Sequence, residues 1–267
     1  AALFTAGNKG IVRRWDVKTG SNRRLRRLDD GVTHIQCAPD GRRIALGGEK
    51  GRVVIMGVNG GKILREITQH VSPVFGLAWS SQGHRLAVVY RDKSMWIYDS
   101  RTAATITRLP STRFGWHAVA FSKDGRHLYA ADWGRSITVF DGKSWKQKRV
   151  LRGHASLVYG IGASPDGKLL LSGGVDRRVV VWDLQRGEPL VVVEAHRERI
   201  RELLFFSRSR NFATRSWDGT LRLWRLRPGK SPKVGKGHED TIYRLDTSSG
   251  GKSIATVSSD HTVRLWE

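Results

Sequence analysis

Residues 153–194 read GHASLVYGIGASPDGKLLLSGGVDRRVVVWDLQRGEPLVVVE and contain the pattern that decides the fold. Short runs rich in Val, Leu and Ile are separated by turn sequences such as Pro165-Asp166-Gly167. No helical periodicity extends over ten residues, and β-branched runs between Gly, Asp and Pro are typical of strands. Four strands of about five residues with their turns occupy about 40 residues. The stretch therefore predicts one four-stranded antiparallel sheet.

The same pattern recurs along the whole chain. The third strand of each repeat ends in a large residue, at Trp15, Met56, Tyr98, Phe140, Trp182, Trp224 and Trp266, 41 or 42 positions apart. A turn residue repeats every 42 positions, at Gly41, Gly83, Gly125, Gly167, Ser209 and Gly251. Two markers of different chemistry with one period indicate a repeat array. We predict an all-β fold, a seven-bladed β-propeller of four-stranded antiparallel blades.

The length of the chain predicts one incomplete blade. Seven repeats of 42 residues would need 294, and the chain has 267. It begins in a second strand (ALFTAG) and ends in a third (TVRLWE), so one outer and one innermost strand are expected to be missing at the seam between the termini. We expect residues 1–267 to form a single propeller domain and to be a fragment of a longer chain.

Charge is the unusual feature of the composition. The chain has 47 Lys and Arg against 24 Asp and Glu, a formal net charge of +23. Such a surface attracts acidic proteins, nucleic acid or anionic membranes, although an Arg-rich composition of no functional meaning would give the same count. No stretch has the roughly 20 apolar residues that span a bilayer. The single cysteine, Cys37, is expected to be packed, and the lack of a disulfide framework favours a cytoplasmic location.

Dipeptides at fixed places in the repeats carry a family resemblance. They are Gly153-His154, Ala195-His196 and Gly237-His238 before the first strand, and Trp15-Asp16, Trp182-Asp183 and Trp266-Glu267 at the end of the third. Through these dipeptides the chain resembles the WD-repeat β-propeller family, and the resemblance covers its whole length. Repeats two to four match less well, since Met56-Gly57, Tyr98-Asp99 and Phe140-Asp141 replace the second dipeptide.

Three repeats carry a His, a Ser or Thr, an Asp and a Trp at constant offsets. These sets are His154, Ser172, Asp176 and Trp182; His196, Thr214, Asp218 and Trp224; and His238, Thr256, Asp260 and Trp266. A hydroxyl, an imidazole and a carboxylate are also the groups of a hydrolase triad. Repetition at one period and the lack of a nucleophile turn around Ser172 favour a structural hydrogen-bonded tetrad instead, as the resemblance also implies.

The other repeats keep only parts of this tetrad. Repeat three has His70 and Asp92, and repeat one has Thr5 and Trp15. Repeats two and four show no tetrad that the sequence reveals. No cysteine or histidine pair has the spacing of a metal site, and no phosphate-binding loop occurs, so we expect no metal, no cofactor and no enzymatic activity.

Resemblance to the family implies that partners bind on the face formed by the loops that enter each blade and those between its second and third strands. The repeat places a set of aromatic and basic residues there, typical of binding hot spots. The candidates are Phe75, Arg91, His117, Trp133, Tyr159, Arg199, Arg201, Trp217 and Tyr243. We expect a monomeric scaffold that binds a protein or peptide on this face, and the positive charge of the chain favours an acidic one.

A second candidate surface is a basic rim on the outer strands. It comprises Arg23, Arg24, Arg26 and Arg27, then Lys143, Lys146, Lys148, Arg149 and Arg152, and finally Arg225, Arg227, Lys230, Lys233 and Lys236. Charge on edge strands also prevents pairing between molecules, which would explain many of these residues without a ligand. The alternative function is therefore nucleic-acid or ribonucleoprotein binding through phosphate contacts.

Overall fold

The computed structural model describes residues 2–16, 18–206, 210–226, 233–235, 240, 242–247, 254–260 and 262–266. For residues 233–235, 243, 244, 247 and 257 this description covers the backbone alone. All regular structure in these ranges is β-strand. The strands belong to two compact units, residues 1–121 and 122–267, which are described separately below.

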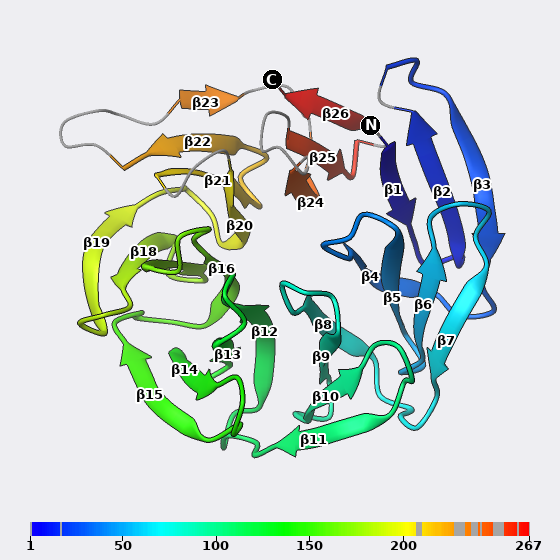
Figure 1. Ribbon diagram of the computed structural model, residues 1–267. Coiled ribbons are helices and arrows are strands. Elements are labelled where there is room, and N and C mark those ends of the chain that lie inside the picture. Colours follow the sequence, from blue (N-terminus) through cyan, green and yellow to red (C-terminus); the bar gives the residue numbers. More distant parts are fainter. Residues whose placement is uncertain are drawn as a thin grey trace. The chain divides into compact units, whose positions relative to one another are not determined.

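Residues 1–121 contain twelve strands (Figure 1). They are β1 (Ala2–Ala6), β2 (Ile11–Asp16), β3 (Asn22–Arg27), β4 (Val32–Cys37), β5 (Arg43–Gly48), β6 (Val53–Gly57), β7 (Ile63–Ile67), β8 (Val74–Trp79), β9 (Arg85–Tyr90), β10 (Met95–Asp99), β11 (Thr105–Leu109) and β12 (Trp116–Phe121).

Residues 122–267 contain the other described strands. They are β13 (His127–Asp132), β14 (Ser136–Asp141), β15 (Gln147–Arg152), β16 (Val158–Ala163), β17 (Leu169–Gly174), β18 (Arg178–Asp183), β19 (Glu188–Glu194), β20 (Ile200–Phe206), β21 (Asn211–Ser216), β22 (Leu221–Arg225), β23 (Lys233–Gly235), β24 (Ile242–Thr247), β25 (Ile254–Ser258) and β26 (Val263–Trp266).

Strand order follows chain order in every sheet, and the described strand pairs are antiparallel. The sheets are β1-β2-β3, β4-β5-β6-β7, β8-β9-β10-β11, β12-β13-β14-β15, β16-β17-β18-β19, β20-β21-β22-β23 and β24-β25-β26. The protein is thus an all-β seven-bladed β-propeller, which confirms the fold class predicted from the repeat. The first and last sheets have three described strands each, in keeping with the length of the chain.

Sheets are stacked through their first strands. In residues 1–121, β4 contacts β1, β8 contacts β4 and β5, and β12 contacts β8 and β9. In residues 122–267, β20 contacts β16 and β17, and β24 contacts β20 and β21. The third and fifth sheets have a neighbouring sheet on each face, and their middle strands β9 (RLAVVY) and β18 (RVVVWD) are buried along nearly their whole length. This burial explains why these runs do not alternate.

The 42-residue glycine marker has a conformational cause. Gly41, Gly83, Gly125 and Gly167 lie in the turn between the first and second strands of their sheets, with φ between +65° and +70°. Each donates its backbone N–H to the carbonyl three residues earlier. A positive φ costs other residues energy because of their Cβ, so the turn favours glycine at this position.

The prediction that Cys37 is packed was wrong. Its side chain is exposed. Cys37 is the last residue of β4, beside Ile44 of β5, and the burial of β4 decreases from Val32 to this end. The alternation in the sequence HIQCAP predicts a buried Cys37, but the residue lies at the exposed end of the strand.

Gly51 and Gly60 have nearly equal φ but different surroundings. Substitution of each by Ala therefore distinguishes the cost of backbone strain from the cost of steric contact. Gly51 (φ +84°) lies in the β5–β6 turn, where an added Cβ would lie 2.5 Å from the carbonyl oxygen of His70. Gly60 (φ +85°) lies in the β6–β7 turn with no atom within 4 Å of such a Cβ. Gly60→Ala should cost about 1 kcal/mol of unfolding free energy from strain alone. Gly51→Ala should cost about 3 kcal/mol, because the loop after β7 must also move.

The measurement is denaturant unfolding of both variants beside the wild-type chain. Equal losses of stability would show that the loop after β7 does not hold this turn as closely as the structure has it.

Candidate functional site

The tetrad of the fifth sheet is formed as a continuous hydrogen-bonded chain. Nδ1 of His154, in the loop before β16, lies 2.8 Å from Oδ2 of Asp176 in the β17–β18 turn. Nε2 of the same ring lies 2.6 Å from Oγ of Ser172 on β17, and the indole Nε1–H of Trp182 on β18 donates to that oxygen over 2.7 Å. The chain therefore ties the entry loop to the two middle strands.

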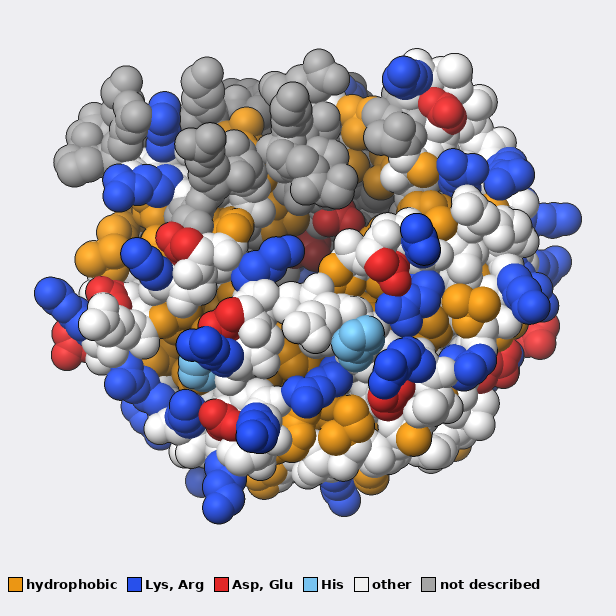
Figure 2. Space-filling view, viewed as in Figure 1, with side chains coloured by type: hydrophobic (Ala, Val, Ile, Leu, Met, Phe, Trp, Pro, Cys, Tyr) orange, Lys and Arg blue, Asp and Glu red, His pale blue; other side chains and the backbone are white. Residues whose placement is uncertain are grey.

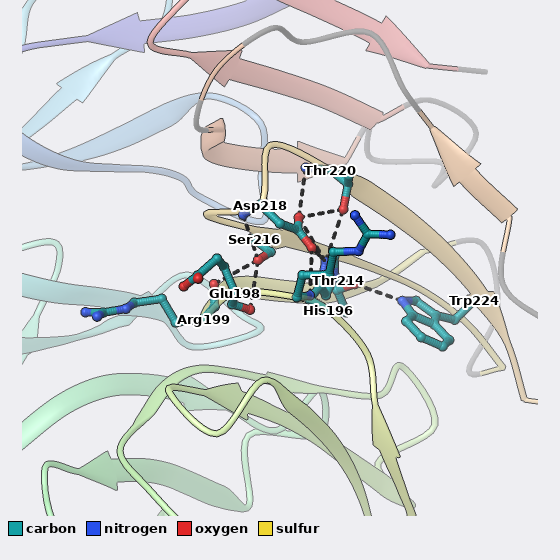
Figure 3. A network of polar contacts seen from close by, with 9 residues as sticks. His196, Glu198, Arg199, Thr214, Ser216, Asp218, Thr220 and Trp224 are labelled. Carbon is teal, nitrogen blue, oxygen red and sulfur yellow. Dashed lines mark hydrogen bonds and ion pairs between the residues drawn. The ribbon is translucent and has the colours of Figure 1, made fainter.

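The sixth sheet repeats this geometry (Figure 3). Nδ1 of His196 lies 3.0 Å from Oδ2 of Asp218, and Nε2 lies 2.7 Å from Oγ1 of Thr214. The indole Nε1–H of Trp224 donates to the same Thr214 oxygen over 2.8 Å. Thr220 adds a donor that repeat five lacks, since its hydroxyl lies 2.6 Å from Oδ1 of Asp218.

Burial and hydrogen bonding set the charges in this network. Burial lowers the pKa of His196 below its ordinary value of 6.5, and Asp218 opposes this only in part. Burial by itself would raise the pKa of Asp218, but hydrogen bonds from His196 and Thr220 outweigh it and hold that pKa well below its usual range. The resting pair is thus a neutral imidazole that donates from Nδ1 to a carboxylate.

Parts of the tetrad recur in the terminal sheets. Trp15 Nε1–H donates to Thr5 Oγ1 over 2.8 Å, and Trp266 Nε1–H donates to Thr256 Oγ1 over the same distance. The carboxylate of Asp260 accepts from the backbone N–H and hydroxyl of Thr262. His238 lies outside the described residues.

Burial argues against a hydrolase at these tetrads. The side chain of His154 is fully buried, and so is Ser172. A nucleophile needs an open path to a substrate carbonyl, and neither group has one. The described geometry is that of a buried structural hydrogen-bond network.

The second and third sheets hold substitutes that the sequence did not reveal. In the second, the buried Asp30 of the entry loop accepts from the backbone N–H of Lys50 in the β5–β6 turn. The acceptor therefore lies in the entry loop and the donor in the turn, the reverse of their places in the tetrads. In the third, His70 Nε2 lies 2.7 Å from the hydroxyl of Tyr98, which stands where other repeats have Trp. Asp92 accepts from the hydroxyl of Ser94 rather than from His70. The aromatic hydroxyl of Tyr98 was the signal available in the sequence.

Five of the candidate partner-binding residues form one cluster in residues 122–267. This arginine–aromatic cluster consists of Trp133, Tyr159, Arg199, Arg201 and Trp217. Trp133 meets Tyr159 edge to face at 6.1 Å between ring centroids. The guanidinium carbon of Arg201 lies 4.6 Å from the Tyr159 ring centroid and 5.6 Å from that of Trp217. Arg199 lies over the other end of the cluster, 4.4 Å from the Trp217 ring.

The tetrad and the cluster share the β21–β22 turn. Trp217 directly precedes Asp218, and its backbone N–H donates to the carbonyl of Arg199 over 3.1 Å. The hydroxyl of Ser216 is within hydrogen-bonding distance of the same carbonyl and of that of Glu198 (Figure 3). Trp217 nevertheless keeps 43% of its surface exposed. The polar network thus holds an exposed tryptophan at a fixed place.

The remaining candidates lie elsewhere. In residues 1–121, Phe75 and His117 stand second on β8 and β12 and meet edge to face, with ring centroids 5.9 Å apart. Arg91 is exposed in the β9–β10 turn, and its backbone N–H donates to the carbonyl of Pro73. The side chain of Tyr243 lies outside the described residues.

The basic rim is exposed wherever its side chains are described. On β3 and β15 the Arg and Lys side chains point to solvent, with Lys148 3.3 Å from the carboxylate of Asp141. Lys and Arg outnumber acidic side chains on the face in Figure 2. Arg227, Lys230 and Lys236 lie outside the described residues, as does the side chain of Lys233.

The described part of the chain has neither a cluster of metal-binding side chains nor a membrane-spanning helix. No group of three or more His, Cys, Asp and Glu side chains there could hold a metal ion. These residues also contain no helix long and apolar enough to cross a membrane.

Comparison with protein families identifies the family to which the chain belongs. The family model for the WD domain, G-beta repeat, matches residues 61–99, 145–183, 187–225 and 229–267, more than half of the chain. The chain belongs to the WD-repeat family. Each matched stretch ends one residue after the aromatic residue that closes a third strand, so the family repeat and the 42-residue period coincide.

Comparison with solved structures agrees on the fold. A chain in the crystal structure of a mitotic checkpoint complex superposes with a TM-score of 0.90 over 99% of this WD-repeat chain and 83% of that chain. Sequence identity is 21%, so the likeness shows the fold and no more. No curated protein sequence matches closely enough to count as a relative.

The neutral state of His196 predicts a dependence of stability on pH. Its pKa is lowered in the folded chain, so the unfolded chain takes up a proton first as the pH falls below 6.5. Stability from this group is complete above that pH and is lost as the pH falls toward the folded pKa. His196→Gln should therefore be less stable than wild type at pH 7 and lose less stability between pH 7 and pH 5.

Denaturant unfolding of wild type and His196→Gln at pH 7 and pH 5 measures how the unfolding free energy of each changes with pH. His84→Gln, at an exposed ring in the β8–β9 turn, controls for the substitution itself. A slope in His196→Gln as steep as in wild type would contradict the protonation state assigned to this tetrad.

Proposed function

We propose that this WD-repeat protein is a non-catalytic scaffold that binds a segment of another protein at the arginine–aromatic cluster. The observation that carries the proposal is the stacking of Arg199 and Arg201 on Trp217, a ring that stays 43% exposed on a turn tip. Trp, Tyr and Arg are the residues most enriched among binding hot spots. We further propose that the protein acts as a monomer in the cytoplasm.

The chemistry of the cluster favours an acidic partner. A guanidinium that stacks on a ring through its face keeps its N–H groups in the plane of the fork, where they can bind a carboxylate in bidentate fashion. Stacking also fixes the side chain before binding, which reduces the entropy lost on association. The net charge of +23 would draw an acidic segment toward this surface from a distance.

Family membership supports the same class of function. WD-repeat proteins generally act as interaction scaffolds, and the checkpoint-complex chain with the same fold belongs to a multiprotein assembly. The buried tetrads offer no accessible nucleophile, which supports a role without catalysis.

Nucleic-acid binding is the second candidate, and the exposed basic side chains of β3 and β15 favour it. These strands hold no aromatic residue on which bases could stack, so binding would depend on phosphate contacts. Such binding falls steeply as salt rises between about 50 and 200 mM.

Selection from a random peptide library on the immobilised protein tests the proposal. We expect enriched peptides to contain Asp or Glu and to lose affinity by about tenfold or more in Trp217→Ala and in Arg201→Ala. Affinity is measured by fluorescence anisotropy with the enriched peptides. Trp145→Ala and Arg186→Ala are matched controls. Trp145 lies in the β14–β15 turn and Arg186 in the β18–β19 turn, at the opposite end of the sheets from the turn that carries Trp217.

Peptides that bind the cluster variants as tightly as wild type would contradict the proposal. Failure to enrich any peptide, together with salt-sensitive binding of a generic single-stranded RNA, would favour the basic rim instead.

A further inference from the structure

The outer strand of the fifth sheet carries an exposed apolar run. β19 reads EPLVVVE and is the last strand of the sheet β16-β17-β18-β19. Leu190, Val191 and Val192 are 55%, 40% and 48% exposed, although they are consecutive and so belong to both faces of the strand. Figure 2 shows hydrophobic side chains at the edge of the view where β19 lies.

The other outer strands whose side chains are described are protected by charge. β3 (NRRLRR), β7 (ILREI), β11 (TITRL) and β15 (QKRVLR) each contain Arg, and β15 contains Lys as well. Basic residues on an edge strand hinder the addition of a further strand. β19 has no Lys or Arg, and its only charged residues are the glutamates at its two ends. This edge is therefore open where the others are blocked.

The register shows which backbone groups point away from the sheet. The N–H of Ala195 donates to the carbonyl of Arg177 on the β18 side. In an antiparallel pair the residues that face the neighbouring strand alternate, so Val193 and Val191 also face β18. Val192 and Glu194 then direct their N–H and C=O groups outward. These are the groups with which another strand would pair.

The charge at the carboxyl end of the run points to one kind of partner. Glu194 is 70% exposed at its side chain and lies 3.6 Å from the half-exposed Arg178. Beside the amino end of β19 lies a cavity of about 970 Å³, lined by Leu184, Leu190 and Leu226 together with basic side chains such as Lys168 and Arg210. A strand that pairs with β19 would meet the carboxylates of Glu188 and Glu194 at the two ends and exposed Leu and Val side chains between them.

We propose that β19 is a docking edge for an extended segment of another protein, rich in β-branched apolar residues, with Lys or Arg opposite Glu194. The segment adds as a fifth, antiparallel strand to the sheet, so its basic residue lies at its amino end. Backbone hydrogen bonds to Val192 and Glu194 supply affinity, and the apolar side chains supply contact area. This surface is separate from the arginine–aromatic cluster.

A second copy of the chain offers this edge no complementary charge, since the charged residues of β19 are both glutamates. Antiparallel pairing of two β19 strands centred on Val191 would set Glu188 of one chain opposite Glu194 of the other, and like charges directly opposite destabilise a sheet. Both copies would also carry the same net charge of +23. Charge complementarity thus favours a basic-ended segment of a different protein.

The test uses a fluorescent synthetic peptide, Lys-Thr-Val-Thr-Val-Thr, whose amino-terminal Lys would lie opposite Glu194, and measures anisotropy with the whole chain. Val192→Pro removes an outward N–H without taking a hydrogen bond from the sheet, and should weaken binding by about tenfold or more. Val192→Thr keeps the N–H and the branched shape, so binding should stay within about threefold of wild type. Thermal melting checks that both variants fold.

Charge exchange tests the assigned orientation. Replacing the amino-terminal Lys of the peptide by Glu should weaken binding to wild type and restore it in Glu194→Lys. Trp217→Ala should leave binding of the peptide unchanged, so failure at this edge and failure of the proposed cluster site are distinguishable.

Equal affinity of wild type and Val192→Pro, or no binding to wild type, would overturn the proposal. A wild-type dimer in sedimentation equilibrium that Val192→Pro converts to monomer would overturn it in favour of self-association.

Discussion

In four of the seven described sheets, strand register depends on a hydrogen bond from a tryptophan indole to a hydroxyl on the neighbouring strand. It occurs between β2 and β1, β18 and β17, β22 and β21, and β26 and β25, over 2.7 to 2.8 Å each time. Because it joins positions ten residues apart across one hairpin, it selects one register from those that an apolar run allows. In the fifth and sixth sheets it continues through histidine to aspartate and so fixes the entry loop and the β-turn together.

The position of the β21–β22 turn, which carries Trp217, follows from this hydrogen-bonded network. Asp218 accepts from the hydrogen-bond donors of His196 and Thr220, and Trp217 is the residue just before it. The turn can therefore hold a large apolar side chain in solvent without collapsing onto the sheet. Arg199 and Arg201 then cover the ring from the adjoining loop and strand. A network buried in the sheet thus fixes the position of the surface that we propose for partner binding.

Much of this could be predicted from the sequence, because the repeat is periodic in both apolar and turn residues. The spacing from Trp15 to Trp266 predicts seven sheets, and the offsets from His154 to Trp182 predict which side chains lie close together. Substitutes that break the pattern were missed. Asp30 acts from the opposite loop to the usual aspartate, and Tyr98 supplies a hydroxyl where the pattern has an indole. The exposure of Cys37 was missed since alternation does not show where a strand ends.

Backbone amide exchange in Thr214→Val tests most directly whether the tetrad holds the β21–β22 turn that carries Trp217. Valine keeps the shape of threonine and removes the hydroxyl that joins Trp224 to His196. The account predicts faster exchange at the amides of Trp217, Asp218 and Thr220, which donate within this turn and its anchors, with unchanged rates in the β13–β14 turn around Trp133. Unchanged exchange at all three amides in a folded variant would contradict it.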